Sequence, residues 1–344
     1  MRTEAVSGPV DLILVGASAG GVTALKTLAR DLPSDLPAAV LIVLHTAPTG
    51  GYLAPILDAV GPLEAAFATD GESIRRGRIY VAPPDRHLVV RDDHLHLTRT
   101  PKENWTRPAI NPLFRSAAAA FGPRVAAVVL TGMLDNGTAG LLAVQIARGI
   151  TVVQDPTDAE FPEMPESALA YLDPNHVVPL AQLAGLLARL ALDDGDADPG
   201  SGSRRAGEPL ARQGNPGALD AMNGLPDSVQ DAQPDPPSGF TCPECGGALW
   251  QHEEHGFIDY ICRTGHRFSP LSLLNAQGNV RSDALEAALR AVREEQALAE
   301  MLIARGRERA VDAATLRTRV WRTRELSRLG DALEDIIRGP VDSQ

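Results

Sequence analysis

The chain has 344 residues, of which 44% are hydrophobic, 22% charged and 4% aromatic, and its formal net charge at pH 7 is -12. This composition is ordinary for a globular protein and excludes a fibrous or wholly disordered chain, and the length suits about two domains with connecting sequence. The acidic charge, the absence of any apolar run near the roughly 20 residues that span a bilayer, and a polar start unlike a signal peptide predict no nucleic-acid binding, no membrane insertion and a cytoplasmic location.

Residues 10–192 alternate apolar segments of strand length with helical patterns, and turn residues separate them. Four segments are almost continuously apolar, namely DLILVG from Asp11, AVLIVLH from Ala39, RVAAVVLTG from Arg124 and GITVVQD from Gly149. Strands of that kind are buried on both faces, as in parallel sheets. The fold class predicted for this region is α/β, a doubly wound and mainly parallel sheet with helices on both faces.

Residues 77–99 follow a different pattern, GRIYVAPPDRHLVVRDDHLHLTR, in which apolar and polar residues alternate around a turn at Asp92 and Asp93. Alternation with a period of two is typical of half-buried antiparallel strands. We expect this segment to form a hairpin attached to the main sheet.

Three further regions follow in the C-terminal half. Residues 193–238 are rich in Asp, Gly, Pro, Ser, Asn and Gln and contain few large apolar residues, which predicts a flexible linker. Residues 239–270 contain all three cysteines and are expected to form a zinc-ribbon-like module. Residues 280–338 repeat leucines near helical spacing, which predicts α-helices as a hairpin or coiled-coil segment, with simple intramolecular packing as an equal alternative.

Ser18 lies in the pattern Gly16-x-Ser18-x-Gly20, at the turn between the first buried strand and an amphipathic helix. This is the nucleophile-elbow pattern, in which small neighbours expose the hydroxyl and N–H groups at the helix start can receive an oxyanion. Glycines are also common in ordinary strand-to-helix turns and in loops that bind dinucleotide phosphates. The G-x-G-x-x-G spacing is not met, so a nucleotide-binding protein is the weaker alternative.

His45 directly follows the strand AVLIVL, which places an imidazole at the same sheet edge as Ser18. A histidine at a strand end is often structural, and a general base needs a third group to orient it. The loop LTGMLDNGTAG supplies Asp135 and Asn136 after another buried strand, although both residue types also favour helix N-caps. Together these three strand ends indicate a serine hydrolase.

Six motifs in order make the chain similar to the catalytic domain of the CheB methylesterases over roughly residues 11–192. They are GASAGG, LH, DGExxxxGxIYVAPPDRHL, RPAINPLFRSAA, LTGMLDNGTAG and FPEMPESAL. The resemblance implies that Ser18 is the nucleophile and His45 its base. The residues Ala19, Gly20, Gly21 and Met133 are expected to line the oxyanion and substrate cleft.

The third triad position departs from the family, whose usual pattern has an aspartate immediately before the glycine. This chain has Asn136 there, and Asp135 stands one residue earlier. Replacing a triad aspartate by asparagine can lower turnover by about 10⁴, although asparagine does orient the base in papain-like enzymes. Three outcomes stay open: full activity through Asp135, weak activity through Asn136, or a retained binding role.

The reaction implied by the resemblance is hydrolysis of glutamate γ-methyl esters on methyl-accepting chemoreceptors, with glutamine deamidation as a possible second activity. Receptors are then the expected partners, the cognate receptor methyltransferase is a further one, and catalysis needs no cofactor. Many family members begin with a phosphorylatable receiver domain, which is expected to be absent here because the first catalytic strand begins near Asp11. The alternative is a catalytically attenuated adaptor that binds receptor or methyltransferase.

The cysteine module has ligand spacing suited to a tetrahedral metal. Cys242-x-x-Cys245 is followed by Cys262-x-x-x-His266, a set of four soft or borderline ligands typical of structural zinc. Four protein ligands leave no open coordination position, so we expect zinc to stabilise the module and to take no part in catalysis. The module with its trailing helices also resembles a C-terminal extension of stand-alone proteins of this esterase group, with an expected role in protein interaction.

Overall fold

The structure is a computed structural model that describes residues 9–46, 51–192, 237–308 and 312–339. Most of the predicted linker, 193–236, lies outside the described residues. The chain divides into two compact units, one up to Leu273 and one from Leu274 onward. None of the helices in the described ranges combines the length and the apolar character needed to cross a bilayer.

A seven-stranded sheet, parallel throughout, forms the centre of the first unit. In the order in which they pair, its strands are β10 (His176–Val178), β9 (Ile150–Gln154), β8 (Val125–Val129), β1 (Leu12–Ala17), β2 (Ala39–Leu44), β5 (Arg78–Val81) and β3 (Glu64–Phe67). The four continuously apolar segments correspond to β1, β2, β8 and β9. This confirms the predicted doubly wound α/β class.

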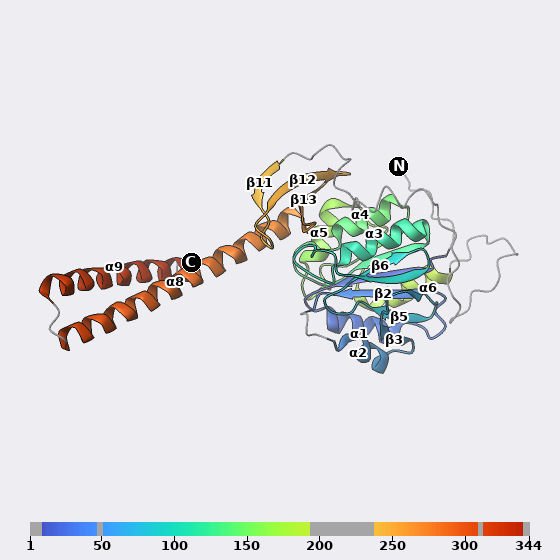
Figure 1. Cartoon of the computed structure of the whole chain (residues 1–344). Helices are drawn as coiled ribbons and strands as arrows, with labels where there is room; N and C mark the ends of the chain where they lie inside the picture. The colour runs from blue at the N-terminus through green and yellow to red at the C-terminus, as the bar shows by residue number, and fades with distance from the viewer. Residues whose placement is uncertain (1–8, 47–50, 193–236, 309–311, 340–344) are drawn as a thin grey trace. The chain divides into compact units, whose positions relative to one another are not determined.

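Helices cover both faces of this sheet (Figure 1). One face carries α1 (Gly21–Asp31), α2 (Leu53–Val60) and α6 (Leu180–Leu192), and the other carries α3 (Ile110–Phe121), α4 (Thr138–Ile146) and α5 (Glu163–Tyr171). Each face of the sheet has its own hydrophobic core, and successive side chains of β1 alternate between them. Ile13 lies in one core, and Leu12 and Leu14 lie in the other. Two buried faces explain why the strand is apolar without a break.

The segment 77–99 differs from the single hairpin that its alternation predicted. Its first part is β5, which pairs in parallel with β2 and β3 inside the main sheet and is buried over Ile79–Val81. Only β6 (His87–Arg91) and β7 (His94–Thr98) form the hairpin, and they pair with β4 (Glu72–Ser73) in a separate three-stranded sheet. A short apolar strand of four residues is too brief for its burial on both faces to be read from alternation.

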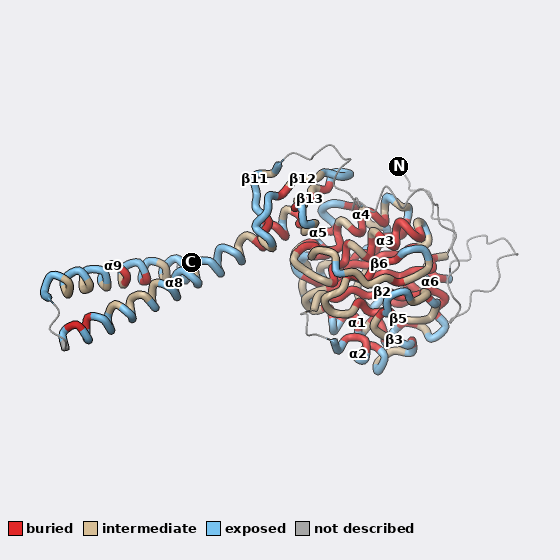
Figure 2. Tube along the Cα trace, viewed as in Figure 1, coloured by how far each residue is buried: buried red, intermediate tan, exposed pale blue. Residues whose placement is uncertain are grey.

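The remaining elements follow α6. Four short strands make an antiparallel sheet: β11 (Pro237–Thr241), β12 (Ala248–Glu254), β13 (Phe257–Cys262) and β14 (Arg267–Phe268). Cys262 ends β13, and Cys242 and Cys245 lie in the turn between β11 and β12. Helices α8 (Pro270–Glu308) and α9 (Ala313–Arg338) follow. In the second unit these two helices are joined by ion pairs from Arg293 to Asp331 and Glu334, and most of their residues are exposed (Figure 2).

The sheet order decides where a ligand can enter. After β1 the chain moves to β2 on one side, and it later returns to β8 on the other side of β1. Loops leaving neighbouring strands in opposite directions open a crevice at the carboxyl edge of such a sheet. The loops that begin at Ser18, His45 and Leu130 all start at this edge.

Candidate active site

Ser18 stands directly after β1 in a tight turn held from both sides. Its backbone N–H donates to Thr131 O at 3.0 Å, and its carbonyl accepts from Gly21 N at 2.9 Å. The turn requires glycine at position 20, because Gly20 has φ 74° and a Cβ there would lie 2.9 Å from a carboxylate oxygen of Glu160. The backbone thereby presents the Ser18 hydroxyl at the helix start.

His45 meets Ser18 across the sheet edge. Its backbone N–H donates to Ala17 O at 3.2 Å, which extends the β1–β2 pairing by one residue, and its Nδ1 lies 3.1 Å from Ser18 Oγ. Parallel register places the residues after Ala17 and Leu44 side by side. The two predicted catalytic residues are therefore within hydrogen-bonding distance, as a nucleophile and its base require.

The imidazole of His45 is enclosed, and burial lowers its pKa to about 4. The ring is therefore neutral at physiological pH and can accept the hydroxyl proton of Ser18 at Nδ1. In that tautomer Nε2 carries the hydrogen. Nε2 is buried and has no hydrogen-bond partner among the described residues.

The side chains of Asp135 and Asn136 are both buried, and both are engaged away from His45. Asp135 accepts a hydrogen bond from the Ser272 hydroxyl at 2.8 Å. Asn136 accepts from Ile110 N at 3.1 Å and donates to the Thr106 hydroxyl at 3.2 Å. Burial raises the pKa of Asp135, although hydrogen bonds from serine hydroxyls oppose that shift.

A second layer of polar groups holds the elbow, and the sequence patterns did not single it out. The hydroxyl of Thr131 donates to Ala19 O at 3.0 Å and accepts from Phe161 N at 2.8 Å, while Thr131 N donates to the buried side chain of Gln154 at 2.9 Å. These bonds tie together the loops that follow β1, β8 and β9. A threonine and a glutamine at strand ends carry no pattern that marks them in advance.

The four residues predicted to line the cleft occupy different positions around Ser18. Ala19 and Gly20 form the turn, and the N–H of Gly21 is already donated to Ser18 O. Met133 is 50% exposed in the loop after β8. Its neighbour Gly132 approaches Ser18 so closely that a Cβ there would lie 2.8 Å from Ser18 Cβ and 2.1 Å from a methionine sulfur, Met164 Sδ.

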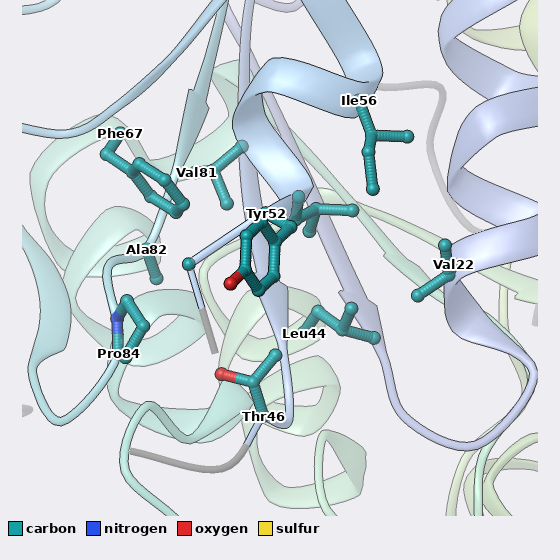
Figure 3. Close-up of a pocket in the computed structure, with 11 residues that line it drawn as sticks. Val22, Leu44, Thr46, Tyr52, Ile56, Phe67, Val81, Ala82 and Pro84 are labelled. Atoms are coloured by element: carbon teal, nitrogen blue, oxygen red, sulfur yellow. The ribbon is translucent and has the colours of Figure 1, made fainter. Parts of the chain in front are cut away.

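An apolar pocket of about 180 Å³ lies beside the base (Figure 3). Leu44 and Thr46, the residues on either side of His45, line the pocket together with Val22, Tyr52 and apolar residues of β3 and β5 that include Phe67. Most of the residues that line the pocket are apolar. An apolar pocket of this kind suits the alkyl part of a ligand or the apolar side of a peptide segment.

Comparison with known proteins decides the family. The family model described as CheB methylesterase matches residues 13–187, about half of the chain. The chain belongs to the CheB methylesterase family.

Curated relatives carry the same family's activity in their names. A "Protein-glutamate methylesterase/protein-glutamine glutaminase 1" from Paramagnetospirillum magneticum is 37% identical over 189 residues, which are 53% of this chain and 50% of that protein. A "Putative protein-glutamate methylesterase/protein-glutamine glutaminase" from Leptospira interrogans is 34% identical over 182 residues, 52% of this chain and 94% of the relative. The chain thus spans about half the length of the first relative and nearly all of the second.

A solved structure agrees with this assignment. The crystal structure of the Thermotoga maritima CheB methylesterase catalytic domain superposes with a TM-score of 0.50 at 29% sequence identity. The matched region covers 53% of this chain and 100% of the Thermotoga maritima chain. The CheB match ends at residue 187. The cysteine module and the C-terminal helices lie outside it.

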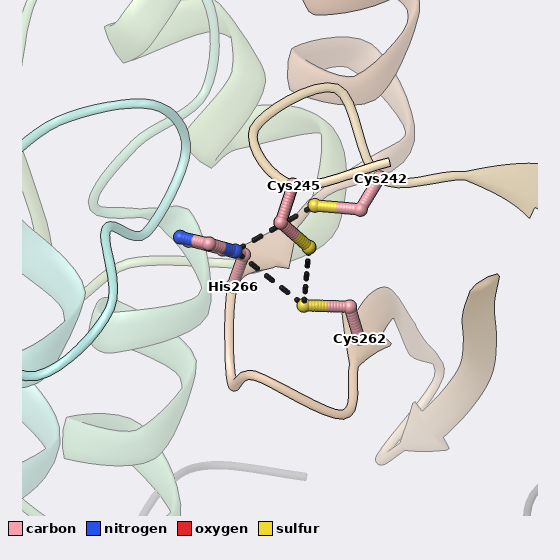
Figure 4. A group of neighbouring side chains, drawn as sticks. All are labelled: Cys242, Cys245, Cys262 and His266. Carbon is pink, nitrogen blue, oxygen red and sulfur yellow. Dashed lines mark hydrogen bonds between the residues drawn. The ribbon is translucent and has the colours of Figure 1, made fainter. Parts of the chain in front are cut away.

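In that module the structure brings the four predicted metal ligands together (Figure 4). The ligand atoms of Cys242, Cys245, Cys262 and His266 all lie within 4.8 Å of one another, and they could hold a metal ion. Cys242 Sγ and Cys262 Sγ lie 3.7 and 3.5 Å from His266 Nδ1, and Cys245 Sγ lies 3.8 Å from Cys262 Sγ. Ligands about 2.1 to 2.3 Å from a tetrahedral zinc ion are separated by about 3.6 to 3.8 Å, so the donor set fits.

Proposed function

We propose that this chain hydrolyses glutamate γ-methyl esters on methyl-accepting chemoreceptors as part of chemosensory signalling. The 3.1 Å hydrogen bond between Ser18 Oγ and His45 Nδ1 is the observation that carries the proposal. It is supported by membership of the CheB methylesterase family and by relatives named for this activity. Those names also support glutamine deamidation as a second activity.

The proposed reaction uses side chains, backbone and water alone. Ser18 Oγ attacks the ester carbonyl carbon while His45 Nδ1 takes the hydroxyl proton, and N–H groups of the elbow and of the loop after β8 stabilise the oxyanion. Collapse of the tetrahedral intermediate transfers the proton from His45 to the departing methoxide, which leaves as methanol. Water, deprotonated by His45, then hydrolyses the acyl-Ser18 bond and releases the glutamate carboxylate.

The first test is methanol release from a methylated receptor. We expect Ser18→Ala to lower the rate by about 10³-fold or more, because a triad member has been removed. Far-ultraviolet circular dichroism of the variant checks that the fold is kept. Methanol release from folded Ser18→Ala at the wild-type rate would rule out the mechanism.

A second candidate function, an attenuated adaptor that binds receptor or methyltransferase, is favoured by one observation. Neither Asp135 nor Asn136 directs its side chain to His45, whose Nε2 has no partner among the described residues. An unoriented base lowers turnover and leaves the cleft intact for binding. A nearly inert wild type that gains activity through Asn136→Asp would favour the adaptor. A large loss of activity in Asp135→Ala would show that wild-type turnover depends on Asp135, which contradicts the adaptor.

The module formed by residues 237–268 is proposed to hold a structural zinc ion. Its support is the Cys242, Cys245, Cys262 and His266 set, whose spacing fits tetrahedral coordination with no ligand position left open. Three cysteines without disulfide partners also suit a reducing compartment, which supports a cytoplasmic location for the protein.

A further inference from the structure

The carboxylate of Asp135 is held by the helix that follows the metal module. Ser272 Oγ donates to Asp135 Oδ1 at 2.8 Å, and the side chain of Ser269 is a second hydrogen-bonding neighbour. Both serines belong to the start of α8, where Ser272 N donates to Ser269 Oγ at 3.2 Å as in a helix N-cap. Asp135, Ser269 and Ser272 are each less than 5% exposed.

The same part of the chain also holds the loop that precedes α3. Asn104 N donates to Arg267 O at 2.8 Å, and Ser269 N donates to Asn104 Oδ1 at 3.0 Å. Two residues later, Thr106 accepts the hydrogen bond from Asn136 Nδ2. Asp135 is therefore connected directly, through Ser272, to the segment that begins at the metal ligand His266. Asn136 is connected to the same segment through the loop that contains Asn104 and Thr106.

Buried charges strengthen this junction. Glu103 is 5% exposed and forms a two-bond ion pair with Arg115 of α3, at 2.9 and 2.5 Å. Lys102 pairs with Glu244, which lies between two metal ligands, at 2.9 Å. Breaking a buried ion pair leaves an uncompensated charge, so the Glu103–Arg115 pair holds this loop firmly against α3. The more exposed Lys102–Glu244 pair is the one that reaches the module.

We propose that Ser272 is a positioning residue of the esterase site, and that the metal-bound module orders the loop 130–137 through it. This inference rests on the proposed methylesterase function. In this structure Ser272 is hydrogen-bonded to Asp135, and Ser18 and His45 are within hydrogen-bonding distance of each other. The docked module is therefore present when the site is assembled. Loss of the Ser272 hydroxyl removes one of the two serine hydrogen bonds to the buried Asp135 carboxylate and loosens the loop that contacts Ser18.

The direct test compares Ser272→Ala with Ser272→Thr and Ser282→Ala in the full chain. Ser282 is an exposed serine of the same helix whose hydroxyl binds only the local carbonyl of Gly278 among the described residues, so its alanine variant is the matched control. We expect Ser272→Ala to lower kcat for methanol release about tenfold with KM unchanged, as for loss of one hydrogen bond to a charged group. Ser272→Thr, which keeps the hydroxyl, is expected to restore most of the rate.

Amide hydrogen exchange of the peptide covering 130–137 gives a second readout that does not depend on turnover. Exchange is expected to rise in Ser272→Ala but not in Ser282→Ala, with zinc content unchanged in both. Stripping zinc from wild type with a chelator is expected to have the same effect on exchange and kcat, and added zinc chloride to reverse it.

Two results would overturn the inference. If Ser272→Ala and Ser282→Ala show the same hydrogen exchange and the same kcat, the Ser272 hydroxyl does not order the loop. A rise in kcat after Ser272→Ala or zinc removal would show that the module restrains the site. A wild type that releases no methanol contradicts the proposed function alone, and the exchange comparison then decides whether Ser272 orders the loop.

Discussion

At His45, the proposed base, burial determines the charge of the ring. Removal of water disfavours the imidazolium, so the pKa falls to about 4 and the ring stays neutral where a base is needed. The same enclosure leaves Nε2 without a partner among the described residues. A buried polar group without a hydrogen bond is costly, and it marks the position where an orienting acceptor or a substrate group would be most stabilising.

The pH dependence of kcat/KM tests this reading of His45. We expect the acid limb to have its midpoint near pH 4, because protonated imidazole cannot take the Ser18 proton. The unfolded chain binds a proton at His45 below about pH 6.5 while the folded chain does not until about pH 4, so this residue's contribution to stability decreases as the pH falls between those values. Samples returned from acid to neutral pH control for irreversible loss, and a limb centred near pH 6.5 would contradict an enclosed base.

At the scale of the structural elements, a largely buried ion pair between Glu103 and Arg115 holds the loop before α3. Burial by itself would raise the pKa of Glu103, but the guanidinium of Arg115 lowers it to about 2. The pair joins the loop to α3, whose first residue, Ile110, donates its N–H to Asn136. One electrostatic contact therefore supports both the junction with the cysteine module and the loop at the end of β8.

We expect Glu103→Ala to lower the free energy of unfolding by about 3 kcal/mol, because it leaves the mostly buried Arg115 guanidinium without its carboxylate partner. In wild type this contribution is present above about pH 4.5, the pKa of an unperturbed glutamate, and is lost as the pH falls toward 2. Urea unfolding at neutral pH measures the loss. Asp31→Ala breaks the exposed pair with Arg30 and serves as the control, and equal effects of the two substitutions would contradict the argument.

At the scale of the whole molecule, the chain stabilises its parts in different ways. The seven-stranded sheet is buried on both faces by helices, whereas the strands β11–β14 bury few large side chains, chiefly Leu249, Phe257 and Phe268. A unit of that size has too little apolar surface to offset its ordering entropy by hydrophobic burial alone. The metal site is therefore expected to supply much of the stability of residues 237–268.

Zinc removal tests this expectation. We expect one zinc ion per chain by elemental analysis, lost in Cys262→Ser, and a chelator to abolish hydrogen-exchange protection in β12 and β13 while β1 and β8 stay protected. The selectivity follows because all four ligands belong to the module of residues 237–268, in the last residue of β13 and in the turns beside the strands. Protection of β12 and β13 that survives complete removal of metal would show that the module folds without it.

The sequence by itself determined the features that local patterns encode. Continuous apolar runs predicted the parallel strands because both faces of such strands are buried. Parallel order places the ends of these strands at one edge of the sheet, which predicted that Ser18 and His45 lie close together. The spacing of Cys242, Cys245, Cys262 and His266 predicted the cluster because the ligands of a metal site are close in the chain. The strand at Arg78–Val81 was assigned to the hairpin because four residues hold too little pattern.

Only the tertiary structure decided what surrounds these residues. Asp135 and Ser272 are 137 positions apart, and a hydrogen bond between two loop residues leaves no periodicity or spacing in the sequence. The lowered pKa of His45 likewise comes from burial of the imidazole, which no local motif encodes. Local order is set by neighbouring residues, whereas the electrostatics and partners of a site are set by segments that meet only in the folded chain.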